Sequence, residues 1–561
     1  MKPKKLAFLL ILYAAAFQML LFNTVQPKAE AYENPVQTMK IGLYYGADAM
    51  AAANLENSVG SGYTFGYFDS SRTFHSVGYT NDTRITMLKD WNMYLSDGTY
   101  KDEEPDNYTG MVGCYHIMLG ERYSSFDEAL ACAANYTDAF PVYYSGVWGV
   151  NVGSYSSYSE AEAANSALGL GGTPMTASSF CVTVVATGTT TILFEFDCGT
   201  DFSLAVMPKA GDGEKAETWF RNNRYCGAFQ YTRKGGGNLT IVNYINIEDY
   251  VKGVVPYEMN NTWPLEALKA QALCARTYAA SHINAHSSHG FDLCCTDCCQ
   301  VYMGQRQVNA NITAAVDFTA GQYILYDNAL CQTFYHSSDG GATENSENVF
   351  VKALPYLKGV FDEYEKQINT GYSSWSFTYT AEEITWILKE KGYPCSNIVS
   401  ITPVYTGMGN IYSLKFTDSN GRNFTFSRSD AGSILCSKTL GKITYSQRFT
   451  IVAEGEGNSP MYINNAGNLV EDPGSLYAVG GSGTVESIGN IGEVTVLTGS
   501  GTETVRLQGS GQVQSGDKYI VSGSGWGHNV GMSQYGARAM ANQGFTYQDI
   551  ITFYFTGVTI G

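Results

Sequence analysis

A strand–helix pattern that occurs twice, 32 residues apart, is the feature of this sequence that most restricts its fold. Each copy has an apolar run followed by a Ser-x-x-Glu sequence, Ser125/Glu128 in the first copy and Ser157/Glu160 in the second. A Ser-x-x-Glu sequence is typical of a helix N-terminus, because both side chains can satisfy backbone N–H groups there. The two units together predict a small α/β module of about 60 residues.

Short alternating runs and frequent glycines predict β structure for most of the remaining chain. Strand-like runs occupy residues 38–100 and 181–247, whereas the helix-rich regions are residues 256–284 and 531–556. Gly-Ser-Gly triplets separate short apolar runs between residues 476 and 525, which is typical of hairpins. We therefore expect an α+β fold: a split mixed α/β core with a β-rich periphery, into which the small α/β module is inserted.

The charge of the chain excludes two classes of partner. Its 52 Asp and Glu residues outnumber its 34 Lys and Arg residues, which gives a formal net charge of −18. A nucleic acid or an anionic membrane attracts a Lys/Arg-rich surface. Because this chain has the opposite balance, we expect neither as its main partner.

The first 31 residues have the three-part layout of a secretory signal peptide. Lys2, Lys4 and Lys5 precede the apolar run Leu6–Phe22, and Ala29–Ala31 offers a small-x-small cleavage site. The alternative is an uncleaved anchor, because the apolar run is at the short limit for a membrane span. We expect an exported protein that is attached to the membrane only if this segment is retained.

Glu258 lies in the stretch Ile247–Ala279, which combines a carboxyl group among aromatic and apolar neighbours with a following helix. Pro264 fits the first turn of that helix. Neighbours such as Tyr257 desolvate the charged form of the carboxyl group, which raises its pKa and lets it donate a proton near neutral pH. The alternative is a structural role, in which Glu258 caps the helix or pairs with Arg276.

This stretch resembles the core signature of the SpoIID/LytB family, sporulation-associated proteins that act on the cell wall. The resemblance covers residues 38–100 and 181–561, and the N-terminal part of the core is expected to reach residue 110. Four further passages match in the family's order, the third with Asn529 in place of a glycine: Tyr335–Glu347, Leu354–Val360, Gly525–Ala537 and Gly544–Gly557.

The resemblance implies that the chain cleaves glycan strands, because the best-described members are lytic transglycosylases whose acidic residue aligns with Glu258. Glu258 would protonate the glycosidic oxygen between N-acetylmuramic acid and N-acetylglucosamine, and then act as a base to give a 1,6-anhydro end. The residues implied to bind the strand are Tyr257, Arg276, His336, Ser337, His528, Gln534 and Tyr535.

A non-catalytic role is the alternative, because some members of the family enhance a separate cell-wall amidase. The expected partners are then that amidase, or a sporulation complex, and the peptidoglycan itself. A zinc hydrolase is a weaker third interpretation, since nothing in the sequence resembles a metalloprotease helix.

Residues 112–168, which contain the repeat, resemble the SPOR domain, a family that binds peptidoglycan glycan strands lacking stem peptides. The resemblance implies that this module and the core share one ligand. The alternative is a structural insertion without a binding role.

A cluster of cysteines indicates a metal site, expected to be a structural Zn²⁺ because four protein ligands leave no open position for water. Many relatives have a Cys…His-Cys-Gln-Val-Tyr pattern here; Cys294 and Cys299 match it, and Cys298 replaces the histidine. His289 is the preferred fourth ligand, with Cys295 and His286 as rivals. A disulfide or free thiols are the alternative.

Overall fold

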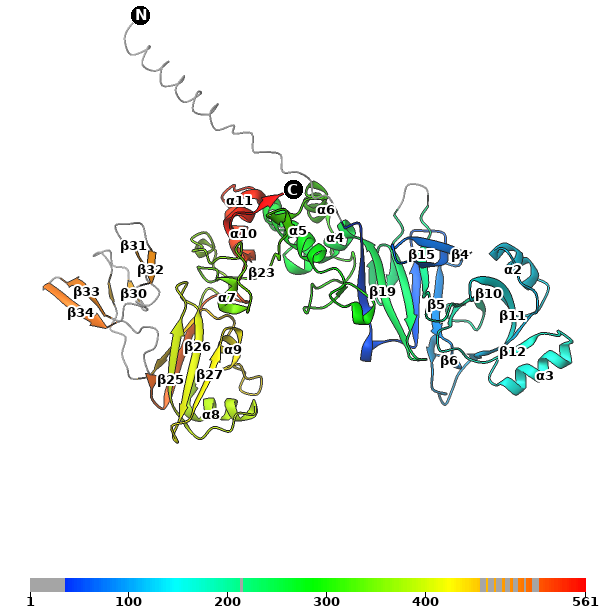
Figure 1. Cartoon of the computed structure of the whole chain (residues 1–561), viewed down its shortest axis with the longest axis horizontal. Helices are drawn as coiled ribbons and strands as arrows, with labels where there is room; N and C mark the ends of the chain where they lie inside the picture. Colours follow the sequence, from blue (N-terminus) through cyan, green and yellow to red (C-terminus); the bar gives the residue numbers. More distant parts are fainter. Residues whose placement is uncertain are drawn as a thin grey trace, which may run out of the picture.

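The computed structural model describes residues 36–211, 215–454 and 514–561, together with short strands between residues 461 and 506 (Figure 1). The helices of the core gather in the middle of the molecule, with the N-terminal sheets on one side and the C-terminal strands on the other. Residues 1–31, for which the signal peptide is predicted, lie outside the described residues. Within the described part, no helix is both long enough and apolar enough to cross a bilayer.

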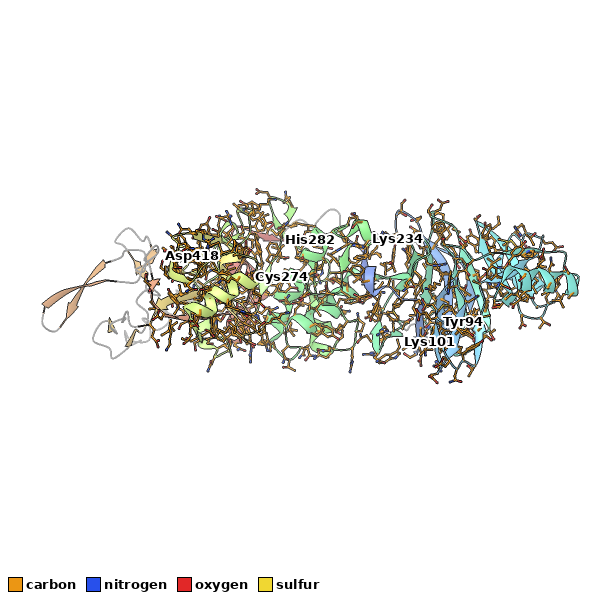
Figure 2. The ribbon with its side chains drawn as sticks, turned by 90° about the horizontal axis from the view of Figure 1, so that it is seen from below. Tyr94, Lys101, Lys234, Cys274, His282 and Asp418 are labelled. Carbon is orange, nitrogen blue, oxygen red and sulfur yellow. The ribbon has the colours of Figure 1, made fainter. Side chains whose placement is uncertain are left out.

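The central helix of the core is α5, which packs against the four other core helices. Residues on all sides of α5 are buried, and Ala, Leu and Cys dominate its sequence, so it forms the middle of the largest hydrophobic core. Figure 2 shows Cys274 of α5, and His282 just after it, in the middle part of the molecule. The helices are α4 (Ile247–Glu258), α5 (Leu265–Ser281), α6 (Ala310–Phe318), α10 (Gln534–Asn542) and α11 (Tyr547–Tyr554).

A seven-stranded sheet lies beside these helices, and its strand β19 leads directly into α4. Asn246 is the last residue of β19, and its side chain caps α4 by accepting a hydrogen bond from the Glu248 N–H. The strands, in sheet order, are β20 (Leu293–Cys294), β1 (Thr38–Tyr44), β19 (Leu239–Asn246), β18 (Ala228–Arg233), β15 (Leu204–Pro208), β3 (Tyr63–Phe68) and β4 (Phe74–Thr80).

The predicted α/β module forms one end of a ten-stranded sheet. Its helices α2 (Phe126–Ala133) and α3 (Tyr158–Leu168) begin at the predicted caps Ser125 and Ser157, whose side chains accept from the N–H groups of Glu128 and Glu160. The strands, in sheet order, are β12 (Thr173–Met175), β9 (Tyr115–Met118), β11 (Val147–Tyr155), β10 (Ala139–Tyr144), β14 (Ile192–Asp197), β13 (Val182–Ala186), β5 (Arg84–Lys89), β2 (Ala52–Asn57), β16 (Thr218–Phe220) and β17 (Asn223–Tyr225).

Two features of this module differ from a separate insertion over residues 112–168. First, the module has a β-α-β-β-α-β order whose last strand, β12, lies beyond residue 168. Second, β10 pairs in parallel with β14, so the module is continuous with the larger sheet. The sheet face opposite the helices is also buried: His116, Asn151 and Phe140 are only 4%, 3% and 2% exposed. The SPOR resemblance therefore stays a prediction, and a glycan strand would have to bind another surface of the module.

The C-terminal strands have a hydrophobic core of their own. They form a sheet of β24 (Trp375–Thr380), β36 (Lys518–Gly523) and β28 (Phe449–Ala453), and a second sheet of β27 (Asn423–Ser427), β26 (Ile411–Asp418), β25 (Ile398–Tyr405) and β35 (Gln514–Ser515). Helices α8 (Ala381–Glu390) and α9 (Ser429–Ser433) belong to this part of the chain. Between residues 461 and 506 the described strands pair as antiparallel hairpins.

Short strands and a small helix complete the fold: β6 (Met93–Ser96), β7 (Thr99–Lys101), β8 (Gly110–Val112), β21 (Ile324–Tyr326), β22 (Ala329–Leu330), β23 (Tyr335–His336), β37 (Met532–Ser533), β38 (Thr559–Ile560) and α7 (Ser346–Val349). The mixture of helices with several mixed sheets confirms the α+β class.

Candidate functional site

Glu258 is the last residue of α4, and its carboxyl group is mostly enclosed by protein. The backbone N–H of Val301 donates to its Oε1 at 3.4 Å, and the Tyr335 hydroxyl donates a second hydrogen bond. Burial raises the pKa of Glu258, and these two hydrogen bonds offset part of that rise because they favour the charged form. The carboxyl group can therefore hold a proton at a higher pH than an exposed glutamate.

A short chain of hydrogen bonds fixes the Tyr335 hydroxyl. The Gln300 amide donates to it at 3.2 Å, and the Tyr250 hydroxyl in turn donates to the Gln300 amide oxygen at 3.2 Å. Neither Tyr335 nor Gln300 has a role predicted from the sequence, although Tyr335 begins one of the matching passages and Gln300 follows Cys299 in the cysteine pattern.

The carboxylates nearest to Glu258 in the sequence bind other groups. Glu248 pairs with Arg276, Asp249 pairs with Lys215, and Glu266 accepts hydrogen bonds from the Lys269 ammonium and from the N-terminus of α11. Glu258 is thus the lone carboxyl group of its site among these residues. This arrangement suits chemistry in which one group serves as acid and then as base.

Arg276 differs from its predicted role in strand binding. Its side chain is fully buried, with Nη2 2.6 Å from Glu248 Oε2 and Nε 2.9 Å from Glu248 Oε1. It also donates to the carbonyl oxygens of Val316 and Gln322. Arg276 therefore ties α5 to α4 and α6, and it is a structural residue rather than a substrate ligand.

The two histidine motifs meet where β23 pairs in parallel with β37, so that His336 lies opposite Ser533. The His336 and His528 rings have centroids 5.4 Å apart. Burial lowers the pKa of His336 well below its usual value and lowers the pKa of His528 to about 4. Both rings are neutral near pH 7, so they can act as hydrogen-bonding groups but do not supply positive charge.

Other predicted residues lie near this pairing with different exposures. Gln534 is buried and donates to the Gln271 amide oxygen at 3.3 Å. Tyr535 donates its backbone N–H to the Ser337 carbonyl oxygen, and its ring is 5.0 Å from the Trp263 ring. Tyr257 is half-buried beside Glu258. Most of the predicted strand-binding residues thus lie around the helical core, whereas Arg276 is enclosed inside it.

A pocket of about 600 Å³ opens at the turn between α4 and α5, directly after Glu258 in the sequence. Its lining combines aromatic rings, amide and hydroxyl groups and one cation. Among these residues, Tyr535 alone is predicted from the sequence to bind the strand. The lining residues are Asn260, Thr262, Trp263, Pro264, Tyr535, Arg538 and Asn542.

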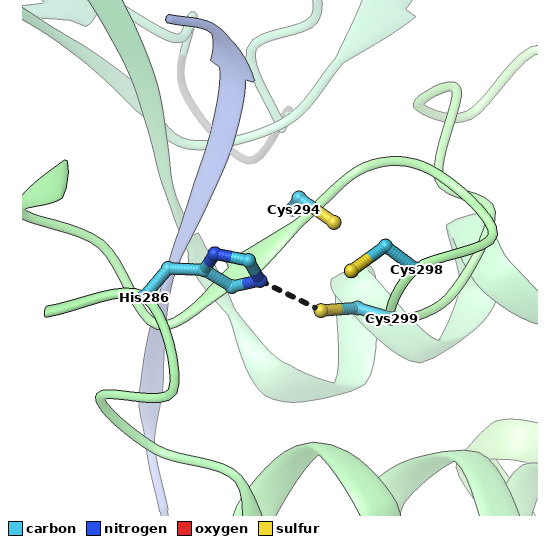
Figure 3. A group of neighbouring side chains, drawn as sticks. All are labelled: His286, Cys294, Cys298 and Cys299. Atoms are coloured by element: carbon cyan, nitrogen blue, oxygen red, sulfur yellow. Dashed lines mark hydrogen bonds between the residues drawn. The ribbon is translucent and has the colours of Figure 1, made fainter. Parts of the chain in front are cut away.

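The metal-ligating group consists of His286, Cys294, Cys298 and Cys299 (Figure 3). One ligand atom from each lies within 4.8 Å of all the others, and His286 Nε2 is 3.2 Å from Cys299 Sγ. Cys294 is positioned by the parallel pairing of β20 with β1. Three thiols and one imidazole are a common donor set for a tetrahedral Zn²⁺ site, so these side chains fit that ion.

The prediction of His289 as the fourth ligand is wrong. The His289 ring packs against Tyr45 and Phe291, with centroids 5.1 Å and 5.9 Å away, while His286 points at the thiols. Cys295 also turns away from the group, and its thiol donates to the Leu43 carbonyl oxygen at 3.6 Å. The cysteines are free thiols in the structure, which does not support the disulfide alternative.

Comparison with protein families identifies the segment that contains this site. Residues 235–326 match the family described as SpoIID, stage II sporulation protein. This segment is therefore similar to the SpoIID family. The SpoIID segment includes α4, α5, α6 and the metal-ligating group, but it does not reach the α/β module or the histidine motifs.

Individual relatives are similar to this chain over a longer range. An uncharacterised protein of Brachyspira hyodysenteriae is 29% identical over 326 residues, 57% of this chain and 68% of that protein. Stage II sporulation protein D of Bacillus subtilis is 27% identical over 57% of this chain and 75% of that protein. The amidase enhancer of Bacillus subtilis is 29% identical over 55% of this chain, and the match spans only 40% of that longer protein.

Proposed function

We propose that this protein is a peptidoglycan lytic transglycosylase that uses Glu258 first as an acid and then as a base. The observation that carries the proposal is the lone, mostly enclosed carboxyl group of Glu258, whose pKa is raised by burial. A glycosidic oxygen is a poor leaving group, so a positioned carboxylic acid must protonate it as the bond breaks. A carboxyl group whose pKa is raised keeps its proton to a higher pH than an exposed glutamate and is therefore better suited to this step.

The single carboxyl group also favours intramolecular attack over hydrolysis. In the first step the bond between C1 of N-acetylmuramic acid and the bridging oxygen breaks, and that oxygen takes the proton of Glu258. In the second step the C6 hydroxyl oxygen bonds to C1, and its proton returns to the Glu258 carboxylate. No water is consumed, whereas most hydrolases need a second carboxylate as nucleophile or base.

Tyr335 and the two neutral histidines would support these steps. The Tyr335 hydrogen bond stabilises the carboxylate that exists between the two proton transfers. His336 and His528 are uncharged, and they would offer hydrogen bonds to the hydroxyl and N-acetyl groups of the strand. Zn²⁺ held by His286, Cys294, Cys298 and Cys299 would brace the loop that presents the Val301 N–H to Glu258.

The protein would act at the cell wall, in sporulation or wall remodelling. Its preferred substrate would be glycan strands stripped of peptides. The second candidate is a non-catalytic enhancer of a cell-wall amidase. Its support is the similarity to the Bacillus subtilis amidase enhancer, which matches this chain as closely as the other relatives do.

The test is to incubate the full-length protein with peptide-free glycan strands and to count 1,6-anhydromuramic ends by mass spectrometry. The wild type should produce them, Glu258→Gln should not, and Glu382→Gln should match the wild type because Glu382 is exposed on the remote helix α8. If the wild type produces none but stimulates a purified amidase, the enhancer role replaces the transglycosylase role.

A further inference from the structure

Arg538 is a cation without an acidic partner at the edge of the candidate site. It lies on α10, and its guanidinium group is 5.0 Å from the centroid of the Trp263 ring. The acidic side chains of the neighbouring helices are engaged elsewhere: Glu248 with Arg276, Glu266 with Lys269, and Asp549 in the cap of α11. Among the described residues, no ion pair with Arg538 is found.

The surroundings of Arg538 suit a sugar that carries an anionic group. Trp263 and Tyr535 have their rings 5.0 Å apart in the same 600 Å³ pocket, where they can pack against the C–H faces of a pyranose. Asn260, Thr262 and Asn542 bring amide and hydroxyl groups that can bond to sugar hydroxyls. The Trp263 ring orients the guanidinium group, whose fork of N–H donors matches a carboxylate.

The pocket is close to the proposed reacting bond. Asn260 follows Glu258 by two residues, so their Cα atoms are at most about 7 Å apart. Glu258 itself does not line the pocket, so a strand that passes its carboxyl group would have to extend past Asn260 to fill the pocket.

We propose that this pocket binds the free lactyl carboxylate of an N-acetylmuramic acid residue, and that Arg538 makes the enzyme select strands stripped of peptides. The inference rests on the proposed function and adds its specificity-determining group. When a stem peptide is attached, the lactyl group is a neutral amide, which cannot form a bidentate ion pair with arginine. Although the chain has a net charge of −18, an unpaired arginine can attract an anionic strand locally.

The binding test uses full-length Glu258→Gln protein, which holds its ligand without cutting it. The probes are two tetrasaccharides of alternating N-acetylglucosamine and N-acetylmuramic acid, one with free lactyl carboxylates and one with lactyl amides, measured by calorimetry. We expect the free acid to bind about tenfold more tightly, since a charge-assisted hydrogen bond is roughly twice as strong as a neutral one. Each further change is made in the Glu258→Gln protein. Arg538→Gln should abolish the difference in affinity, and Arg538→Lys should keep part of it. The control Arg84→Gln, which changes an exposed arginine of the N-terminal part of the chain, should keep all of it.

The outcomes separate this inference from the proposed function. Equal binding of the two tetrasaccharides, or full discrimination in the Arg538→Gln background, overturns the inference even if 1,6-anhydro ends are formed. Discrimination that depends on Arg538 supports it even if no ends are formed, in which case the transglycosylase proposal alone fails. In the active enzyme, Arg538→Gln should raise KM for peptide-free strands more than it lowers kcat. Inorganic phosphate as a competitor shows whether any anion suffices, and displacement of the free acid by phosphate at equal concentration also overturns the inference.

Discussion

The Tyr335 hydroxyl donates a hydrogen bond to the Glu258 carboxyl group, although the two residues belong to different motifs. Tyr335 is the first residue of β23, whose pairing with β37 brings the C-terminal histidine motif to the same place. The hydrogen bond thus connects the SpoIID segment, which contains Glu258, to parts of the chain that lie beyond it.

This contact predicts a change in the pH profile. Tyr335→Phe removes a hydrogen bond that favours the charged form, so the pKa of Glu258 should rise further. Because the acid form of Glu258 starts the reaction, the alkaline limb of kcat/KM should move to higher pH. The check is a pH series on peptide-free strands with Tyr412→Phe, in the C-terminal sheet, as control. A limb that stays in place or moves to lower pH would contradict the role given to Tyr335.

Arg276→Met should reduce stability rather than substrate affinity. The change leaves Glu248 without its partner in a largely buried site, which typically costs about 3–5 kcal/mol. Chemical denaturation should show this loss, and the double variant Arg276→Met/Glu248→Met should recover much of it, since no unpaired charge then remains. KM for strands should be unchanged in whatever fraction remains folded. A stable Arg276→Met protein with a raised KM would return Arg276 to the strand-binding residues.

The metal-ligating group can be tested by changing either of two histidines that lie three residues apart, His286 and His289. We expect about one equivalent of zinc in the purified protein, and a strong loss in His286→Ala because a ligand is missing. His289→Ala should keep its zinc, since the His289 ring packs against Tyr45 and Phe291. The measurement is the zinc content of the wild type and of each variant, determined by elemental mass spectrometry. Zinc below about a tenth of an equivalent in the wild type would discard the site.

The α/β module contains a buried ion pair that should make stability fall at alkaline pH. His116 Nε2 is 3.1 Å from Glu195 Oε1, and this carboxylate is the main reason that the pKa of His116 rises to about 9 despite its burial. The stability due to the raised pKa is complete below about pH 6.5 and is lost as the pH rises through about 9, because the folded state then releases the proton. Asp90, which faces the same group, has its pKa raised by burial to about 7, so it titrates in the lower part of this window.

Denaturation of wild type and His116→Gln between pH 6 and pH 10 measures this effect. The wild type should lose up to about 3 kcal/mol more than the variant across the range. Parallel curves for the two proteins would show that His116 is not charged in the folded state.

Local sequence signals predict some elements well because the physics that forms those elements is local. Ser125 and Ser157 cap α2 and α3 as expected, and Thr546 and Asp549 form the capping box of α11. Each of these depends only on residues three apart, which the sequence displays directly.

Helix α4 is the clearest element that local signals miss. Gly253 and Pro256 both argue against a helix at Ile247–Glu258. In the structure Gly253 is needed there, because a Cβ at this position would be 2.5 Å from the Tyr302 ring, and Pro256 falls near the C-terminal end of the helix. Contacts made by distant residues outweigh the local propensities.

The fourth metal ligand and Arg276 could not be settled from the sequence for a similar reason. His286 and His289 are three residues apart, and the short turn that ends at Gly290, with its positive φ of 93°, decides which ring faces the thiols. Helical spacing gives no sign that Arg276 is enclosed, since helix α5 is covered by other elements on all sides.

The most direct test of the central claim is the yield of 1,6-anhydromuramic ends from peptide-free glycan strands, compared between wild type and Glu258→Gln. The wild type should give many ends, and the variant should give at least about a hundredfold fewer because it cannot donate the proton. Equal yields from the two proteins, or none from the wild type, would contradict it.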